Sequence, residues 1–560
     1  MSTPSGKSAP FGGSFLLEAP PDVFTPEDFT AEHRAIAKAT EDFWTREVEP
    51  NLEAIQRQDF DVLKRTLRKS AELGLVAVLL SERYGGMELD LVSAMIVAEG
   101  IGRDGSYAAC HGGQAGIGVL PIAMFGTAEQ KQKYLPRLAS AELIAAYALT
   151  EPQAGSDALA ARTRADLSPD GTHYVLNGQK MWITNGGIAD LYTVFAKVGG
   201  EKFTAFLVER AWPGVSPGAE EKKMGLKGSS TTAVYFDNVK VPVENVLGET
   251  GRGHIIAFNI LNIGRLSLAV SAHGACRQTL ADAIRYARER RAFGKSISEF
   301  GLIQHKLAEM AVRTYVNESM AYRVIGHIQH SGQPLMKAGE EFAAECSFLK
   351  IFGSETLDYV VDEALQIHGG YGYHQDYPVE RAFRDARINR IFEGTNEINR
   401  LLATGMLLRR AKKGTLPLAA ALKNLSTTAT TDVVANAKKI GLFLLAIASK
   451  KYGESIDEQQ EVVAGITDVL MNAFALESAT ARAKKIKKEN AADMAAVFAD
   501  ETMENIKASA KTVLAACSEG DALRNNLALL RGLTAYELVN SIALRRKIAG
   551  RLLQAGKYVV

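Results

Sequence analysis

Cysteine is scarce in this sequence, and its four cysteines lie far apart along the chain. Cys110, Cys276, Cys346 and Cys517 form no CxxC pair. The chain therefore offers neither a disulfide framework nor a thiolate metal site, and its cysteine usage favours a reducing compartment. The ten histidines include no HExxH motif, which argues against a zincin-type centre. We predict that the protein binds no metal.

A strong net charge is lacking as well. The 65 lysines and arginines almost balance the 64 aspartates and glutamates, and the formal net charge is +1 at pH 7. Without a strong overall field, the protein is not expected to bind nucleic acid. No GxGxxG motif follows a strand-like segment, so a Rossmann nicotinamide site is not predicted either.

Long apolar runs and targeting segments are also missing. No apolar run approaches the roughly 20 residues that cross a bilayer. The opening stretch MSTPSGKSAPFGGSF lacks the apolar core of a secretory signal and the arginines of a typical transit peptide. We expect a cytoplasmic protein of bacterial type.

The pattern of the remaining sequence predicts several domains, as a length of 560 residues requires. Apolar residues recur at helical intervals except in one middle stretch, where short β-branched and aromatic segments alternate with Gly, Asn and Pro. The predicted fold class is α+β. The predicted segments are a disordered tail over 1–25, a helical domain over 26–145, a β-domain over 146–250, a helical bundle over 251–410 and a further helical domain over 411–560.

Three motifs carry the strongest functional signal. They are AYALTEPQAGSDA at 146–158, QIHGGYGYHQDYPVERAFRDAR at 366–387 and FEGTNE at 392–397. In content, spacing and order they resemble the acyl-CoA dehydrogenase family, and the resemblance extends over roughly 25–410. It implies an N-terminal α-helical domain, a middle β-barrel domain and a C-terminal four-helix bundle.

Within that family the sequence is most similar to the very-long-chain branch. Subunits of that branch carry an additional C-terminal helical domain, as the extension over 411–560 would be. In some relatives the catalytic glutamate comes from the helix that includes NILNIGRLSLA, immediately before the arginine. Gly264 precedes Arg265 here, so the resemblance assigns the catalytic base to Glu393.

The resemblance implies FAD-dependent α,β-desaturation of an acyl-CoA thioester, the first step of fatty acid β-oxidation. A base removes a proton from Cα while a hydride leaves Cβ. Phe392 and a water-excluding acyl chain are expected to raise the pKa of Glu393 toward neutrality, as a general base requires. Gly394 gives the backbone clearance beside the thioester. An electron-transfer flavoprotein is the implied electron acceptor.

The family pattern also implies the cofactor contacts. The stretch from 147 to 156 is expected along the isoalloxazine edge, and 182–184 against one ring face. Outside their motifs, Trp182 would be an ordinary strand aromatic and the RERR run a solvated helix face. The predicted FAD-binding residues are Tyr147, Leu149, Thr150, Gly155, Ser156, Trp182, Ile183, Thr184, Arg290, Phe293, Gln304, Gln366, Gly369, Gly370, Thr395, Asn396 and Glu397.

The substrate contacts follow from the same resemblance. Small residues in HGGQAGIG, at 111–118, align with the helix at the blind end of the acyl pocket and favour a long acyl chain. Close helix packing would explain the same glycines. Arg265 suits an ion pair within its helix as well as a CoA contact. The predicted substrate-binding residues are Ser156, Asn262, Arg265, Phe392 and Gly394.

The carboxy-terminal quarter allows two interpretations. The segment 437–451 is an ordinary core-packing helix, or it lies on a membrane surface, because the very-long-chain branch associates peripherally with membranes. The basic run ARAKKIKKEN at 481–490 predicts a solvated helix face. A homodimer is implied, since relatives with the extra domain are dimers. The residues that share one face of 437–451 are Ile440, Phe443, Leu444 and Ile447.

Three alternatives to a long- or very-long-chain dehydrogenase stay open from the sequence. The chain could act on acyl-CoA thioesters of another length, or it could be an acyl-CoA oxidase. It could also be a scaffold or assembly partner of respiratory complexes built on the same fold. The intact Glu393 and the intact WIT and EGT motifs argue against a loss of catalysis.

Overall fold

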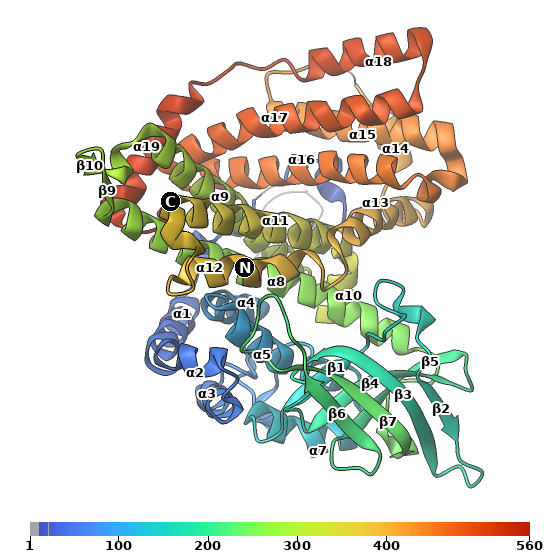
Figure 1. The fold of residues 1–560 in the computed structure, drawn as a ribbon. Helices are drawn as coiled ribbons and strands as arrows, with labels where there is room; N and C mark the ends of the chain where they lie inside the picture. The colour runs from blue at the N-terminus through green and yellow to red at the C-terminus, as the bar shows by residue number, and fades with distance from the viewer. Residues whose placement is uncertain (1–9, 21, 427) are drawn as a thin grey trace. The chain divides into compact units, whose positions relative to one another are not determined.

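The computed structural model describes residues 10–20, 22–426 and 428–560 (Figure 1). The chain divides into two compact units. One contains Thr30–Ala275 and Arg384–Ile388, and the other contains the described residues up to Phe29 together with Cys276–Phe383 and Asn389–Val560. The α+β class predicted from the sequence is confirmed.

The first part of the Thr30–Ala275 unit is helical. Several of its helices begin at a side chain that accepts a hydrogen bond from the backbone N–H three residues ahead, as Thr30, Asp90, Asp104 and Thr127 do. These caps explain where the helical pattern starts. The helices are α1 (Ala31–Phe43), α2 (Leu52–Gln56), α3 (Phe60–Glu72), α4 (Leu91–Ile101), α5 (Gly105–Ala115), α6 (Leu120–Phe125) and α7 (Ala128–Ala139).

The second part of this unit is an eight-stranded sheet. Its strand order is β6-β7-β3-β2-β4-β5-β8, and β1 pairs in parallel with β4. The long β3–β7 ladder shifts register after Leu176 and again between Lys180 and Ile183. The strands are β1 (Ala145–Ala148), β2 (Arg164–Leu167), β3 (His173–Thr184), β4 (Leu191–Val198), β5 (Lys202–Glu209), β6 (Val215–Glu220), β7 (Thr231–Pro242) and β8 (Val246–Leu247).

The other unit is built mainly from long helices, of which α9, α11, α16 and α17 pack side by side. Helices α8 and α12 each belong partly to this unit and partly to the other, because the division falls after Ala275 and after Phe383. The remaining helices from α9 to α19 belong to this unit. The bounds of the helices are α8 (Gly253–Glu289), α9 (Gly301–Gln329), α10 (Leu335–Glu341), α11 (Ala343–His368), α12 (Pro378–Ala386), α13 (Asn396–Lys412), α14 (Leu418–Lys423), α15 (Val433–Tyr452), α16 (Gln460–Ile486), α17 (Glu489–Cys517), α18 (Gly520–Leu533) and α19 (Ser541–Ala555). The hairpin β9 (Arg291–Ala292) and β10 (Lys295–Ser296) joins α8 to α9.

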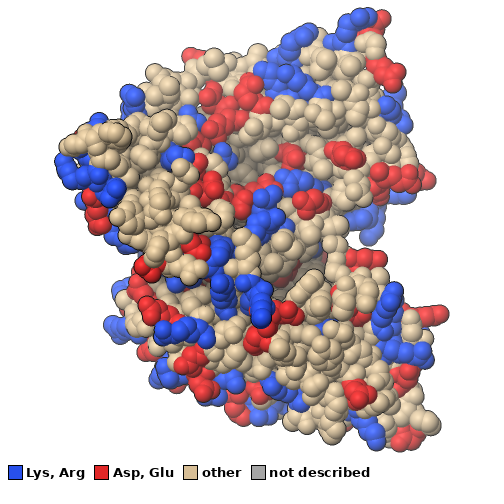
Figure 2. Space-filling model, viewed as in Figure 1, with Lys and Arg blue, Asp and Glu red and all other residues tan. Residues whose placement is uncertain are grey.

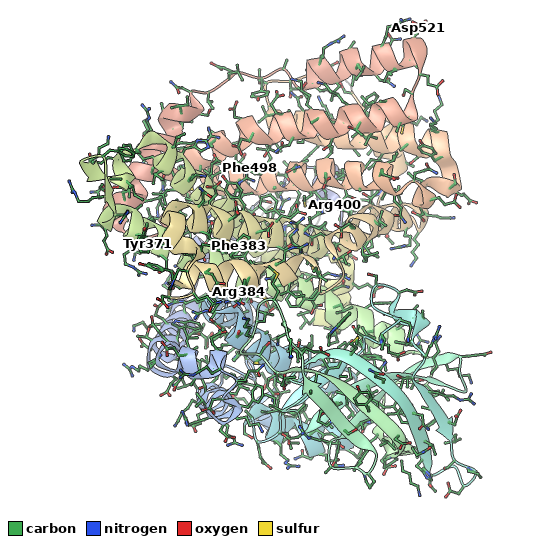
Figure 3. All side chains as sticks on the ribbon, in the orientation of Figure 1. Tyr371, Phe383, Arg384, Arg400, Phe498 and Asp521 are labelled. Atoms are coloured by element: carbon green, nitrogen blue, oxygen red, sulfur yellow. The ribbon has the colours of Figure 1, made fainter. Side chains whose placement is uncertain are left out.

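The carboxy-terminal extension packs on the bundle through both rings and charges. Phe498 of α17 meets Phe352 of α11 at a centroid distance of 6.0 Å, and Arg323 of α9 pairs with Glu477 of α16 at 2.8 Å. Figure 3 shows Phe498 within the helical layer and Asp521 in the first turn of α18. Both members of the Arg323–Glu477 pair are at least 95% buried. Breaking such a buried pair is costly, so it fixes how the extension seats on the bundle.

Helix α15 is a core-packing helix in this structure. Ile440 and Leu444 are fully buried, while Phe443 and Ile447 are half-buried. Within the described chain, the helices long and apolar enough to cross a membrane are Gly253–Glu289 and Gln460–Ile486, whose apolar windows are 61% and 78% buried. Burial of this extent is typical of core helices. The membrane-surface interpretation of α15 gains no support.

The basic run at 481–490 differs from the predicted solvated face. Lys484, Lys487 and Lys488 are exposed, but the side chain of Arg482 is 2% exposed and pairs with Glu318 at 2.6 Å. The prediction from charge pattern failed at Arg482 because a guanidinium can be buried where carboxylates satisfy its fixed set of donors.

The predicted disordered tail over 1–25 also differs from the structure. Residues 1–9 lie outside the described residues, but Phe15 and Leu16 are each 3% exposed. The Phe15 ring meets Phe474 of α16 at 5.1 Å, and the backbone N–H of Gly13 donates to Glu345 of α11 at 2.7 Å. Two apolar residues inside a polar stretch are enough to anchor it, because the bundle offers a matching apolar site.

We expect Phe15→Ala to lower the free energy of unfolding by about 3–5 kcal/mol, because the substitution empties a buried aromatic site. The measurement is urea unfolding followed by fluorescence. Leu167→Ala, at a position 53% exposed on β2, serves as the control and should change stability by less than about 0.5 kcal/mol. Equal, small effects of both substitutions would contradict the docking of this segment.

Candidate active site

Glu393 lies in the link before α13 and has a left-handed backbone conformation, with φ of +57°. Bulky residues rarely adopt this conformation, and it persists only where the surroundings hold it. The side-chain amide of Asn399 donates to the carbonyl oxygens of Glu393 at 3.3 Å, Gly394 at 2.8 Å and Thr395 at 3.1 Å. One buried side chain from the first turn of α13 therefore fixes the backbone that presents the carboxylate.

Asn396 strengthens the same support. It is 1% exposed, its carbonyl oxygen accepts from Lys350 at 2.7 Å, and its amide donates to Ser354 and Glu355, each at 3.0 Å. The structure thus places the side chain of Asn396 in packing against α11. The side-chain oxygen and amide of Asn396 both bind residues of α11, so the side chain has no polar group left for the predicted FAD contact.

The neighbouring positions show how α13 is anchored. The Thr395 hydroxyl accepts from the backbone N–H of Ile398 at 3.2 Å and caps the helix. Glu397 is exposed, and its pKa is lowered by backbone N–H groups at the helix start and by the Thr395 hydroxyl. Arg400 pairs with Glu355 at 2.9 Å and with Asp468 at 2.8 Å, and lies between helices in Figure 3.

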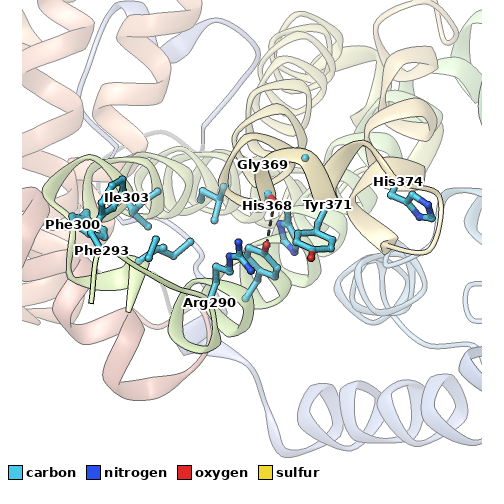
Figure 4. Close-up of a pocket in the computed structure, with 13 residues that line it drawn as sticks. Arg290, Phe293, Phe300, Ile303, His368, Gly369, Tyr371 and His374 are labelled. Carbon is cyan, nitrogen blue, oxygen red and sulfur yellow. Dashed lines mark hydrogen bonds between the residues drawn. The ribbon is translucent and has the colours of Figure 1, made fainter. Parts of the chain in front are cut away.

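A groove of about 650 Å³ lies in the same unit, at the end of α8 and the starts of α9 and the 369–373 turn (Figure 4). The volume is within the range of small-molecule sites. Four residues predicted from the sequence line it together. The lining residues are Tyr286, Arg290, Ala292, Phe293, Ile297, Phe300, Ile303, Ile367, His368, Gly369, Gly370, Tyr371 and His374.

The floor of the groove is rigid and aromatic. Tyr286 stacks on His368 at a centroid distance of 4.0 Å and donates from its hydroxyl to the His368 carbonyl at 3.2 Å, the dashed line in Figure 4. Burial lowers the pKa of His368, so its ring is neutral at pH 7. The Arg290 guanidinium lies 5.4 Å from the centre of the Tyr371 ring. A cation over an aromatic floor suits a phosphate-bearing ligand.

Two features leave this groove open to a ligand. Phe293 is 94% exposed on a left-handed backbone with φ of +52°, at the tip of the β9–β10 hairpin. A Cβ added at Gly369 or Gly370 would meet no atom within 4 Å. Gln304 and Gln366 do not line the groove, and the Gln304 amide donates to the Ser298 carbonyl at 3.0 Å.

The predicted flavin stretch lies in the other unit. Thr150 is half-buried, and Gly155 and Ser156 are exposed, so their hydroxyls and backbone are accessible. Tyr147 and Leu149 are buried, and the Tyr147 ring packs on Phe195 at 5.0 Å. Their side chains belong to the sheet core, which leaves only their backbone to a ligand.

Trp182 stands at the bulge that interrupts the β3–β7 ladder. It is 60% exposed and has φ of +56°. Thr184 is half-buried, whereas Ile183 is 2% exposed and faces the core. A large exposed aromatic on strained backbone is unusual in a soluble fold and favours stacking on a planar ligand.

A buried ion pair joins the flavin stretch to the Trp182 strand, and the motif comparison did not single it out. Lys180 Nζ lies 2.7 Å from Glu151 Oε1 and 3.0 Å from the Leu149 carbonyl oxygen. Burial lowers the pKa of Lys180 to about 8, although Glu151 opposes this shift. Burial raises the pKa of Glu151, but Lys180 and the hydrogen bonds of Thr163 and Arg162 lower it further, and the net direction is down. Both groups are therefore charged at pH 7.

The predicted substrate residues divide by environment. Asn262 and Arg265 are each 5% exposed on α8, and the Arg265 guanidinium donates to the side-chain oxygen Oδ1 of Asn262 at 2.9 Å. In the 111–118 stretch, a Cβ at Gly112 would meet no atom within 4 Å, whereas one at Gly118 would lie 2.6 Å from a backbone oxygen. Small residues are thus required by packing at Gly118 but leave open space at Gly112.

The described residues fit FAD. They supply accessible hydroxyls and backbone at Thr150 and Ser156, an exposed ring at Trp182, and a guanidinium beside open glycines in the groove. These are the groups that an aromatic ring system joined to a pyrophosphate requires.

Comparison with known proteins agrees with this geometry. The sequence matches the acyl-CoA dehydrogenase N-terminal domain over residues 30–142, the middle domain over 146–239 and the C-terminal domain over 251–408. A further acyl-CoA dehydrogenase C-terminal domain matches over 436–532.

Individual relatives extend over nearly the whole chain. A protein named "Probable acyl-CoA dehydrogenase" from Bacillus subtilis (strain 168) is 47% identical over 98% of both chains. The crystal structure of the acyl-CoA dehydrogenase complexed with FAD from Bacillus anthracis has a TM-score of 0.96 and 47% identity, and covers 99% of this chain and 100% of that chain. The human mitochondrial very long-chain specific acyl-CoA dehydrogenase is 45% identical over 63% of this chain and 54% of its own length.

The match over the full length, the four matching domains and the fit of the site residues to FAD lead to one conclusion. This chain belongs to the acyl-CoA dehydrogenase family, whose members are FAD-dependent oxidoreductases that act on CH–CH groups.

Proposed function

We propose that this chain converts long- and very-long-chain fatty acyl-CoA thioesters to trans-2-enoyl-CoA and that Glu393 is the catalytic base. The observation that carries this proposal is the left-handed backbone of Glu393, held by three hydrogen bonds from Asn399. A strained, well-supported carboxylate is characteristic of a functional group rather than of a solvated loop.

The residues of the chain have distinct tasks in this reaction. Glu393 removes the proton from Cα, and Phe392 beside it, 36% exposed, contributes to excluding water once the acyl chain is bound. Gly394, with φ of +78°, lets the thioester approach the backbone. When bound, FAD supplies the acceptor for the two electrons that leave with the Cβ hydrogen. We further propose that an electron-transfer flavoprotein then takes these electrons, as the family relationship suggests.

The preference for long chains is supported by the open space at Gly112 and by the similarity to very long-chain specific relatives. A blind pocket lengthens when the residue at its end is small. We assign Gly112 this role because it is the glycine of the 111–118 stretch around which the structure leaves room for a side chain.

We also propose a homodimer in which the groove of one subunit holds the pyrophosphate and adenine of the other subunit's FAD. Apolar side chains are strongly exposed around the groove: Phe293 at 94%, Leu302 at 80%, Leu538 at 77% and Ile542 at 64%. In Figure 2 the area at the left, where α9 and α19 lie, is largely uncharged, with lysine and arginine side chains at its outer edge by the β9–β10 hairpin. Exposed apolar groups gathered in one area favour a protein–protein contact. A cytoplasmic location is part of the proposal.

We expect Glu393→Gln to retain FAD and bind acyl-CoA but to reduce the rate of flavin reduction by about 100- to 10,000-fold, because an amide cannot accept the Cα proton. The measurement is anaerobic stopped-flow absorbance after mixing with palmitoyl-CoA. Glu454→Gln, at a position 96% exposed, is the control. Bleaching of the Glu393→Gln flavin at the wild-type rate would refute the assignment of the base.

Gly112→Leu should lower kcat/KM for palmitoyl-CoA by about tenfold or more and leave octanoyl-CoA much less affected, because added carbons shorten the pocket. Steady-state assays across a series of chain lengths measure this effect. Gly532→Leu, whose Cβ also meets open space but on α18, controls for a general effect of added bulk. A uniform loss across all chain lengths would remove the argument for a length-setting role.

Arg290→Ala should weaken FAD binding by about 10- to 100-fold, since it removes charge-assisted hydrogen bonds to phosphate. Titration of apoprotein with FAD gives the Kd. The neighbouring exposed Arg288→Ala is the matched control and should bind FAD as the wild type does. If the two variants bound FAD equally, the groove would not be the phosphate site.

A further inference from the structure

Lys180 is a buried charge on the inner face of a strand. Along β3 the residues Tyr174, Leu176 and Lys180 share one face and are buried, and Lys180 is 0% exposed. An inward-facing position on such a strand ordinarily carries an apolar side chain. Its partner Glu151 is 3% exposed and also accepts from the backbone N–H groups of Arg162 at 2.5 Å and Thr163 at 3.0 Å.

The Lys180–Glu151 pair fixes one short stretch of backbone, residues 149–151. Lys180 holds the residues on both sides of Thr150, through the Leu149 carbonyl at 3.0 Å and the Glu151 carboxylate at 2.7 Å. The Thr150 carbonyl accepts from the backbone N–H of Met181 at 2.9 Å. Three successive residues are thereby tied to β3, and the backbone that carries the Thr150 side chain is fixed relative to that strand.

The same lysine stands at the edge of the Trp182 bulge. The β3–β7 pairing stops after Lys180 and resumes at Ile183, so Met181 and Trp182 lie outside it. Trp182 therefore depends on the bonds at its N-terminal side for its strained φ of +56°. Lys180 and Met181 supply those bonds through their contacts with the 149–151 backbone.

Stability alone does not explain this arrangement. Apolar residues of similar volume often replace a buried ion pair without loss of stability, so such a pair is weak evidence for a structural role. A lysine here has a property that apolar residues lack, because its ammonium reaches two acceptors on either side of one residue. By bonding both acceptors, Lys180 fixes the geometry of the backbone on either side of Thr150.

We propose that Lys180 is a positioning residue for the flavin: its ammonium holds the 149–151 backbone and the Trp182 bulge in one fixed relation, so that the Thr150 hydroxyl and the Trp182 ring meet the isoalloxazine together. This inference rests on the proposed assignment of 147–156 and 182–184 to FAD. Lys180 itself need not touch the cofactor.

The test uses two variants of the full chain. Lys180→Met alone leaves Glu151 buried without its cation and is expected to destabilise the protein. In Lys180→Met with Glu151→Gln no charge is buried, but the amide oxygen keeps only one of the two backbone bonds, because Arg162 and Thr163 donate to different oxygens of Glu151. We expect the double variant to have a higher thermal midpoint than Lys180→Met alone, because no unpaired charge is buried, but to show shifted flavin absorption bands, a changed flavin midpoint potential and flavin reduction slowed about tenfold or more.

Arg323→Met with Glu477→Gln, which removes a comparably buried pair in the other unit, is the matched control and should leave the flavin spectrum and potential unchanged. A double Lys180 variant with a wild-type spectrum, potential and rate would overturn the positioning role. Two further variants, Thr150→Ala and Trp182→Phe, show whether such a result refutes only the positioning role of Lys180 or also the assignment of the loop and bulge to FAD. If neither changed the flavin spectrum, the assignment of the loop and bulge to FAD would itself be wrong.

Discussion

Left-handed backbone under large side chains is the constraint on which the proposed site depends. Trp182, Phe293 and Glu393 all have positive φ, a conformation that costs about 1–3 kcal/mol for each non-glycine residue. The backbone conformation of each of these residues is supported by a different set of local contacts. Asn399 holds the carbonyls at Glu393, the β9–β10 hairpin carries Phe293, and bonds from β3 to the 149–151 backbone flank Trp182. Among the described residues, three of the ten non-glycine residues with positive φ thus lie where the family pattern places the ligands.

The carboxy-terminal extension contributes to this support within its own unit. Arg545 of α19 pairs with Glu309 of α9 and, at 2.7 Å, with Glu501 of α17, and Arg313 joins the same cluster. Phe300, which immediately precedes α9, and Ile303 in the first turn of α9 lie in the wall of the groove. A network of charges that ties α9 to α17 and α19 thus also stiffens one side of the groove. A buried ion pair is weak evidence for added stability, and under the proposal that the groove holds part of a FAD molecule, this network would keep the groove in one arrangement.

Much of the fold could be predicted from the sequence because periodicity and caps are local signals. The change from helical to strand period near Ala145 and back near Gly253 follows directly from residue spacing. The described part of the amino-terminal segment could not be predicted this way. Phe15 and Leu16 are two apolar residues among small polar ones, and only the distant Phe348 and Phe474 make them core residues. Arg482 was misjudged for the same reason, since its partners Glu27 and Glu318 come from elsewhere in the chain.

The site shows a second limit of motif comparison. Motifs identify residues whose family role is to touch a ligand, such as Thr150 and Trp182, and they pass over the residues that hold those groups. Glu151 lies inside the 146–158 motif, in the TEP triplet, and Lys180 lies two residues before the WIT motif. The signal was present as a lysine on the apolar face of a strand, where alternation demands a hydrophobic residue. A charge that breaks the pattern of its own element is costly unless it is paired. A search of each motif for such residues therefore finds the positioning groups that comparison by ligand contact leaves out.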